Sequence, residues 1–143
     1  MYLSVHVTIG AILGRYIPNP FLAFVTGFIG HFLTDMIPHG DAAVYKKFKR
    51  GINKKRSVAF GLIDSSIAIM LTALLLSFGE FNSNFSVALA IIGSVLPDLI
   101  IGLHILYEPR WLNAFHDFHF FMHNLIVNRY RDWKQLHGAI FQS

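Results

Sequence analysis

Two long apolar runs constrain the fold of this chain more than any other feature of its sequence. Residues 57–78 and 85–107 each reach the length of about 20 residues that a helix needs to cross a bilayer, and each carries a single carboxylate, Asp64 or Asp98. In lipid a lone segment satisfies its backbone hydrogen bonds only as a helix. The runs therefore predict two membrane-spanning helices that are joined by the short polar turn 79–84.

The composition places the whole chain in the same class. Its 143 residues are 54% hydrophobic and only 14% charged, whereas soluble domains carry about 25% charged residues, and the mean hydropathy is +0.49. No polar linker interrupts the chain, and its length is that of one domain of about 100–150 residues. We expect a single all-α, membrane-embedded bundle of four to five helices that covers residues 1–143.

The first 37 residues predict a helical hairpin. Segment 3–16 is apolar and barely long enough to span, and Gly10 and Gly14 stand four apart, a spacing that lets helices approach closely in lipid. A Pro-Asn-Pro turn at 18–20 separates it from a second apolar helix over 21–37. The start of the chain lacks the basic region of a cleavable signal peptide.

Basic residues are concentrated in one loop. Of the twelve Lys and Arg residues, seven lie between Lys46 and Arg56. Such clusters mark the cytoplasmic side of a membrane protein and attract anionic lipids. We therefore expect a multi-pass protein of the inner (cytoplasmic) membrane with loop 42–56 in the cytoplasm, membrane lipids as partners, and no nucleic-acid partner.

Segment 110–128 predicts a helix of another kind, rich in aromatic residues and histidines. His116, His119 and His123 follow i, i+3, i+7 spacing and so share one face. Arginines flank the segment on both sides, which favours a position along the cytoplasmic interface rather than across the membrane.

The most informative short motif is His31 and Asp35, four residues apart at the end of an apolar helix. This spacing places both side chains on one face, a turn apart, as two ligands of one cation would lie. Pro38 ends the helix, and His39 and Asp41 follow in a loop that can fold back over the same point. The stretch predicts half of a metal site.

The topology brings the remaining ionisable residues to the same depth. With a rise of about 1.5 Å per residue, Asp64 lies roughly 12 Å into the membrane from the cytoplasmic side, and Asp98 lies at a comparable depth. Asp64 could equally bond to a hydroxyl group of a neighbouring helix. The expected metal ligands are His31, Asp35, Asp98, His119 and His123, with His6, Asp64 and His116 as further ligands or orienting groups.

These motifs resemble a known family. The HxxxD of residues 31–35, the Leu96-Pro97-Asp98 triplet and the histidine-rich helix resemble the small membrane-bound metal-dependent hydrolases, and the HxxxD is similar to that of zinc-dependent phospholipase C. In this chain HxxxD precedes the triplet, and residues 116–119 stand where the family has HRGxTHS. The resemblance implies a metal-dependent hydrolase.

The residue types also limit the chemistry. Cys is absent, so His and carboxylate ligands must hold the metal, with zinc expected, manganese or iron as alternatives, and enough ligands for two ions. His39 or Asp41 is the expected catalytic proton acceptor, and Arg110 is expected to bind a phosphate. The depth of the site favours a phosphoester or an amphiphilic, lipid-like substrate.

Non-catalytic functions remain as alternatives. A metal- or cofactor-binding subunit would share the same ligands. An ion transport component would need polar residues along a path to both faces, and the outer half of the predicted bundle offers few. A lipid-surface scaffold would use the basic loop and the aromatic helix, and it would bind no metal.

Overall fold

The computed structural model describes residues 2–37 and 54–130, and these residues form an all-α structure without strands. This confirms the predicted all-α class. The five α-helices and one 3₁₀ turn are α1 (Leu3–Tyr16), α2 (Pro20–Asp35), α4 (Lys54–Phe78), α5 (Asn84–Tyr107), η1 (Arg110–Leu112) and α6 (Asn113–Tyr130).

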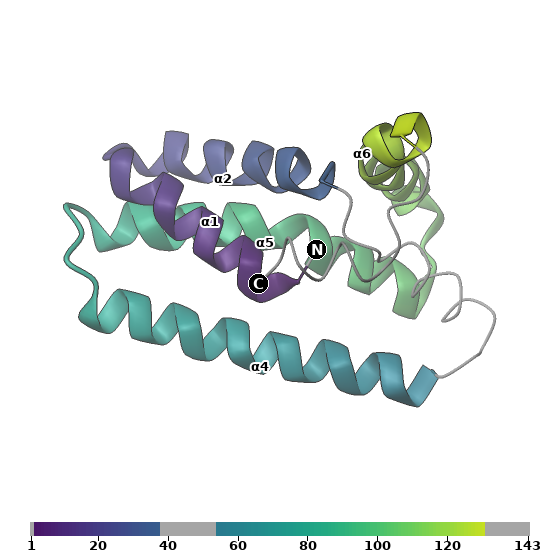
Figure 1. Cartoon of the computed structure of the whole chain (residues 1–143), viewed down its shortest axis with the longest axis horizontal. Coiled ribbons are helices and arrows are strands. Elements are labelled where there is room, and N and C mark those ends of the chain that lie inside the picture. Colours follow the sequence, from purple (N-terminus) through teal and green to yellow (C-terminus); the bar gives the residue numbers. More distant parts are fainter. Residues whose placement is uncertain (1, 38–53, 131–143) are drawn as a thin grey trace.

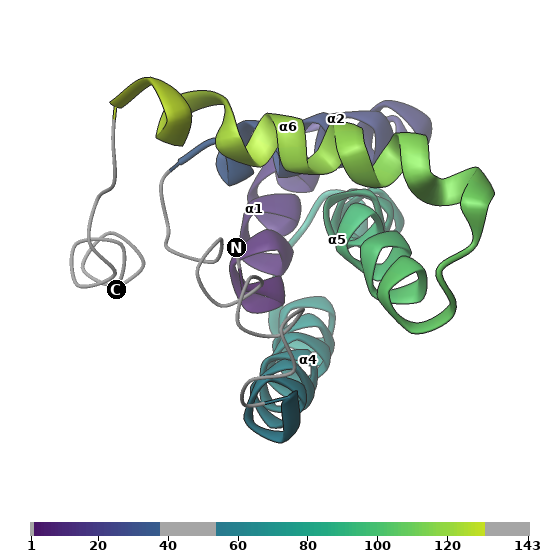
Figure 2. The same cartoon turned by 90° about the vertical axis from the view of Figure 1, so that its right-hand side faces the viewer.

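Helices α1, α2 and α5 form the centre of the bundle. The most extensive packing joins α5 to α2 and to α1, while α4 lies beside α1 (Figure 1). Helix α6 crosses one end of the bundle, where it contacts α2 and α5 (Figures 1 and 2). Helix α1 begins, and α2 and α5 end, toward this same end, so the predicted ligands of several helices can meet there.

The predicted hairpin of the first two helices is present. Asn19 caps α2 by accepting a hydrogen bond from the N–H of Leu22 at 3.1 Å, and Pro20 occupies the first helical position, where its missing N–H costs nothing. Helix α2 ends at Asp35, two residues before the predicted end. The two helices have 14 and 16 residues, which is shorter than the roughly 20 needed to cross a bilayer unaided.

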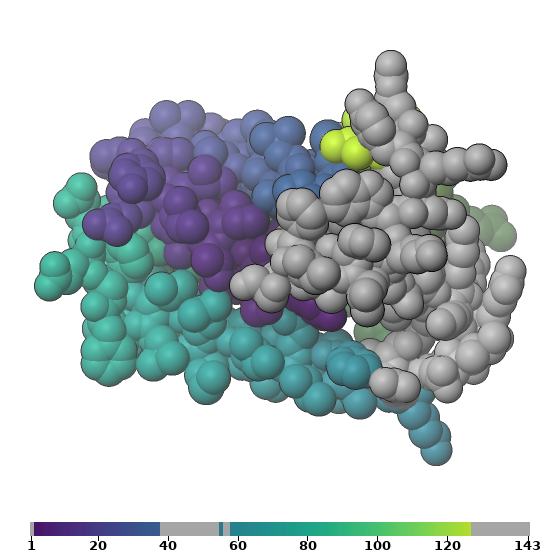
Figure 3. Space-filling view, viewed as in Figure 1, coloured from purple at the N-terminus to yellow at the C-terminus, as the bar shows by residue number. Residues whose placement is uncertain are grey.

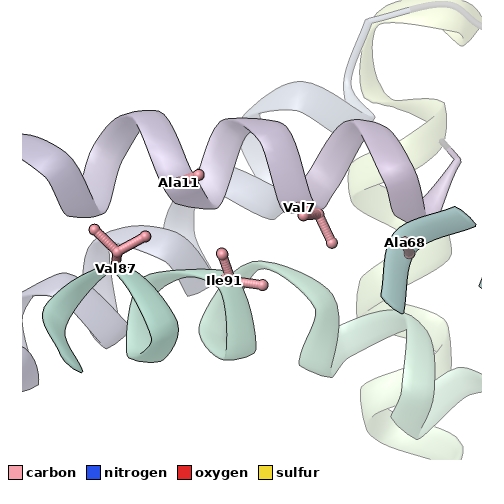
Figure 4. Packing of buried hydrophobic residues seen from close by; sticks show 5 residues of the cluster. All are labelled: Val7, Ala11, Ala68, Val87 and Ile91. Atoms are coloured by element: carbon pink, nitrogen blue, oxygen red, sulfur yellow. The ribbon is translucent and has the colours of Figure 1, made fainter. Parts of the chain in front are cut away.

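Small residues allow α1 and α5 to pack closely, as the glycine spacing predicted. A Cβ at Gly10 would lie 2.7 Å from the Cα of Ile91, and a Cβ at Gly14 would lie 2.7 Å from the Cα of Val87. The same contact buries a small apolar core (Figure 4). Its members are Val7, Ala11, Ala68, Val87 and Ile91.

Helix α4 is the outermost element of the described structure. Apolar side chains are exposed along most of its length, and Figure 3 shows this helix along the lower edge of the molecule. Within the described residues, Val58–Phe78 of α4 and Asn84–Tyr107 of α5 are the two segments long and apolar enough to cross a membrane, as judged by length and composition.

A tight turn redirects the chain between α5 and α6. Glu108 ends α5 in the left-handed conformation with φ 47°, and Pro109 follows it. A non-glycine residue rarely adopts this conformation, and here it redirects the chain before the 3₁₀ turn η1. The turn allows α6 to lie across the bundle end, which brings its histidines over the ends of α2 and α5.

Candidate metal centre

The HxxxD motif lies on the last turns of α2, and both of its side chains point into the bundle. His31 and Asp35 are fully buried, and the Nε2 atom of His31 lies 3.0 Å from Oδ2 of Asp35. Their four-residue spacing places them on one face of α2, and that face is the one packed against α5.

Helix α5 contributes the second carboxylate. Oδ1 of Asp98 lies 3.8 Å from Nε2 of His31 and 3.7 Å from Nε2 of His119. The side chain of Asp98 is 21% exposed. Its carboxylate therefore lies at the edge of the otherwise buried cluster. Pro97 precedes it and cannot donate a backbone hydrogen bond to the carbonyl one turn earlier, which opens the helix in the turn next to the site.

Helices α1 and α6 supply the remaining imidazoles. Nε2 of His6 lies 3.2 Å from Oδ1 of Asp35, Nε2 of His119 lies 3.7 Å from Oδ2 of the same carboxylate, and Nε2 of His123 lies 2.9 Å from that Oδ2. Imidazoles of three helices, α1, α2 and α6, thus converge on Asp35. The spacing of His119 and His123 along α6 is what allows both to reach it.

The geometry of this cluster fits a metal ion. One ligand atom from each of His31, Asp35, Asp98 and His119 can be chosen so that all four lie within 4.8 Å of one another. Ligands at about 2.0–2.2 Å from a tetrahedral ion lie about 3.4 Å apart, which is close to the measured imidazole-to-carboxylate separations of 2.9 to 3.8 Å. The buried group can therefore hold a metal.

The hydrogen bond made by His31 supports the same conclusion. Its Nδ1 donates to the carbonyl oxygen of Ser94 at 2.8 Å; a carbonyl only accepts, so the proton of the neutral ring lies on Nδ1. The lone pair of Nε2 then faces an oxygen of Asp35 that also only accepts. At 3.0 Å these two atoms need a proton or a metal cation between them, and metal-bound histidines commonly make a second hydrogen bond such as the one from Nδ1 to Ser94.

Aromatic rings hold the imidazoles in place. Phe32 packs edge-on against His31, with ring centroids 5.2 Å apart, and against His119 at 5.8 Å. Phe118 covers the other side of Phe32 at 5.2 Å. These contacts restrict rotation of the two rings and exclude water from one side of the cluster.

Burial also keeps His119 in the form that binds a metal. Desolvation, reinforced by the neighbouring His123 and His31, lowers the pKa of His119 from 6.5 to about 3. The ring is therefore neutral at physiological pH, and only a neutral imidazole has a lone pair to offer a metal.

Asp64, a predicted ligand, lies apart from the cluster. Its carboxylate accepts hydrogen bonds from the backbone N–H groups of Leu3 at 2.6 Å and Ser4 at 3.3 Å, and from the Ser4 hydroxyl at 2.8 Å. Asp64 therefore caps the N-terminus of α1 from the neighbouring helix. The open N–H groups and partial positive charge of that terminus account for its position.

His116 is also separate from the cluster, although it shares a face of α6 with His119 and His123. Its ring stacks on His104 of α5 with centroids 4.5 Å apart, and its Nδ1 lies 3.2 Å from an oxygen of Asp117. The three histidines span two turns of α6, and the bundle end meets only the last two.

The predicted catalytic and substrate-binding residues are not part of the described cluster. Arg110 lies exposed at the start of η1. His39 and Asp41 lie outside the described residues, as does most of loop 42–56.

Ser94 contacts two residues of the cluster, and the sequence patterns did not indicate this. Besides accepting from His31 through its carbonyl, it donates its hydroxyl to the backbone carbonyl of His6 at 2.9 Å. It is fully buried. The sequence signal that could have indicated it is a polar residue one turn before Asp98 in an otherwise apolar helix.

Comparisons of this chain with known proteins do not add a relative to this picture. No family model, no curated protein and no solved structure matches the chain.

Proposed function

We propose that this protein is a membrane-embedded, metal-dependent hydrolase that acts on a phosphoester or amphiphilic substrate at the cytoplasmic face of the membrane. The observation that carries the proposal is the convergence of imidazoles from three helices on the carboxylates of Asp35 and Asp98. Carboxylate charge in a buried cluster is costly, and a divalent cation at this point would offset the charge of both carboxylates.

The ligand types indicate the metal. A site of imidazoles and carboxylates without thiolates suits zinc, with manganese or iron as alternatives. When bound, such an ion supplies a hydroxide nucleophile at neutral pH, because it lowers the pKa of water from about 15.7 to about 7.

The side chains at the edge of the cluster suit a hydrolytic role. Asp98 and His123 are 21% and 16% exposed, so they border the route by which a substrate and water would enter. Arg110, at the turn before α6, is the proposed phosphate-binding group. His39 and Asp41 are the proposed proton acceptors, because the motif that supplies two ligands continues directly into them.

The membrane location is supported by the two apolar segments within α4 and α5. The basic loop before α4 favours the cytoplasmic side for the cluster end of the bundle. A site at this depth would meet lipid headgroups, which is why we propose an amphiphilic phosphoester rather than a freely soluble one.

Hydrolysis of bis(p-nitrophenyl) phosphate and of short-chain phospholipids in mixed micelles would test the activity. We expect turnover by the purified wild-type protein with added zinc or manganese, and loss of turnover after chelation or in Asp35→Asn. The matched control is His104→Ala, which removes a histidine outside the cluster. Wild-type protein that binds metal but hydrolyses neither substrate class would contradict the hydrolase proposal.

A non-catalytic metal-binding protein is the second candidate, and the burial of the cluster favours it. His6, His31, Asp35 and His119 are all at most 2% exposed, and structural metal sites have no open coordination position. Cobalt substitution separates the candidates: a spectrum that changes when phosphate is added supports an open, catalytic site. An unchanged spectrum supports the structural one.

Site-directed labelling would test the membrane location, because the chain has no native cysteine. A lipid-soluble maleimide should react with Ile69→Cys on α4, whose native side chain is 70% exposed. It should not react with Ala90→Cys on α5, which is buried. A water-soluble maleimide that labels Ile69→Cys equally fast in vesicles would show that α4 does not face lipid.

A further inference from the structure

Each of the two carboxylates in the cluster faces His6 with one oxygen and faces the other imidazoles with its second oxygen. Oδ1 of Asp35 faces His6 at 3.2 Å, whereas Oδ2 faces His31 at 3.0 Å. Asp98 repeats this division: Oδ2 faces His6 at 3.7 Å, and Oδ1 faces His31 at 3.8 Å and His119 at 3.7 Å. Each carboxylate therefore lies between His6 and the remaining imidazoles of the cluster.

The spacing of the rings matches two ions rather than one. His6 and His31 stack with centroids 4.1 Å apart and planes inclined by 27°. Their Nε2 atoms face the same two carboxylates through different oxygens, so an ion bound to each ring would be displaced by about the ring spacing. Paired metal ions in enzymes lie about 3.5–4 Å apart and are commonly bridged by carboxylates.

His6 is otherwise difficult to explain. Its side chain is fully buried, and neither Nδ1 nor Nε2, the nitrogen that faces the carboxylates, has a hydrogen-bond partner within the described residues. A buried polar ring without full hydrogen bonding is destabilising. The hydroxyl of Ser94 binds the backbone carbonyl of His6 and so fixes the residue in a position where its Nε2 points at the carboxylates.

From these three observations we propose that the cluster holds two divalent cations bridged by Asp35 and Asp98. His31 and His119 are ligands of the first ion, and His6 is a ligand of the second. The inference rests on the proposed metal-dependent function and deepens it: two ions would stabilise both the attacking and the leaving oxygen of a phosphoryl group, which a single ion does less well.

Metal stoichiometry in the full-length, detergent-solubilised protein provides the test. After loading with zinc and removal of excess metal, wild type should retain two equivalents per chain and His6→Ala should retain one. His104→Ala, which removes a histidine of the same bundle end outside the cluster, should retain two. One equivalent in wild type, or two in His6→Ala, would overturn the inference and leave the metal site itself standing.

A second measurement on the unmodified protein does not depend on how well His6→Ala folds. Manganese-loaded wild type should give the exchange-coupled, multiline electron paramagnetic resonance spectrum of two carboxylate-bridged ions. The six-line spectrum of isolated Mn²⁺ at full loading would overturn the inference. Wild type that binds no zinc and no manganese would instead contradict the proposed function, so the two failures are distinguishable.

Discussion

Helices α4 and α5 are alike in sequence and different in structure. Each contains an apolar segment long enough to cross a membrane, yet 6% of the apolar window of α4 is buried in the protein against 44% for α5. Each carries one carboxylate, but Asp98 of α5 joins the His/Asp cluster whereas Asp64 of α4 caps the N-terminus of α1. Apolar length alone therefore does not determine which helix becomes central.

Small side chains account for the difference. Along one side of α5, Ser86, Ala90, Gly93 and Ser94 are buried and let α1 and α2 approach closely. Helix α4 has Gly61, but a Cβ there would meet nothing within 4 Å. The pattern of small residues, rather than hydropathy, placed α5 between two neighbours and gave its carboxylate access to their ligands.

The largest expected effect is on zinc affinity, which should depend on Asp98 and not on Asp64. Asp98→Asn should lower the affinity for zinc by at least about 100-fold, because it removes a charged ligand. Loss of a group that only orients a ligand already lowers metal affinity by about 10–100-fold. Asp64→Asn should leave the affinity unchanged. Competition titration with a fluorescent chelator measures the zinc affinity of each variant. Equal losses of affinity in the two variants would contradict the different roles assigned to Asp98 and Asp64.

The packing difference can be tested at two glycines. Gly10→Ala should lower the free energy of unfolding by about 1–3 kcal/mol, because the new methyl group would clash with the backbone of α5 at Ile91. Gly61→Ala on α4 should be neutral or stabilising by up to about 1 kcal/mol, since alanine favours a helix. Reversible unfolding in detergent gives both values, and similar losses would mean that α4 is as tightly packed as α5.

The cluster end should also respond to pH in the metal-free protein. Between pH 6.5 and about 3 the unfolded chain protonates His119 while the folded chain does not, because burial lowers the pKa of this residue to about 3 in the folded state. Stability should thus be complete above pH 6.5 and fall below it by up to about 1.4 kcal/mol per pH unit. Melting curves with chelator present measure this, and a flat profile from pH 6.5 to 5 would contradict it.

The smallest effect concerns the capping carboxylate of α4. Asp64→Ala should destabilise the protein by about 1 kcal/mol, as expected for the loss of a helix cap. Ser66→Ala is the matched control on the same helix, because its hydroxyl bonds only to the Leu62 carbonyl of its own helix. Equal stability of the two variants would show that the link between α4 and α1 contributes little.

Much of this arrangement could be predicted because it follows from local spacing. The four-residue interval between His31 and Asp35 fixes a shared face of α2, and Gly10 and Gly14 predicted close packing before any partner helix was known. The end-to-end order of the helices then placed Asp98 at the same end. These features depend on helix geometry, which the sequence determines directly.

The remaining features depend on how whole helices meet. A carboxylate such as Asp64 satisfies a helix terminus as readily as a metal, and the choice depends on the position of α4 relative to α1. His116 shares a face with His119, but the crossing of α6 over the bundle leaves it beside His104. The contribution of Ser94 was missed because both of its hydrogen bonds involve a main-chain carbonyl, its own or that of His6, and main-chain groups leave no pattern in the sequence.

Ser94 also couples the two neighbours of α5. Through its carbonyl it fixes His31 of α2, and through its hydroxyl it fixes the backbone of α1 at His6. A slide of α5 along its axis would disturb both hydrogen bonds at once, so cation affinity should report the register of three helices. Insertion of one residue between Ser94 and Asp98 would turn Asp98 by about 100° around the axis of α5, away from the imidazoles, and should abolish ion binding.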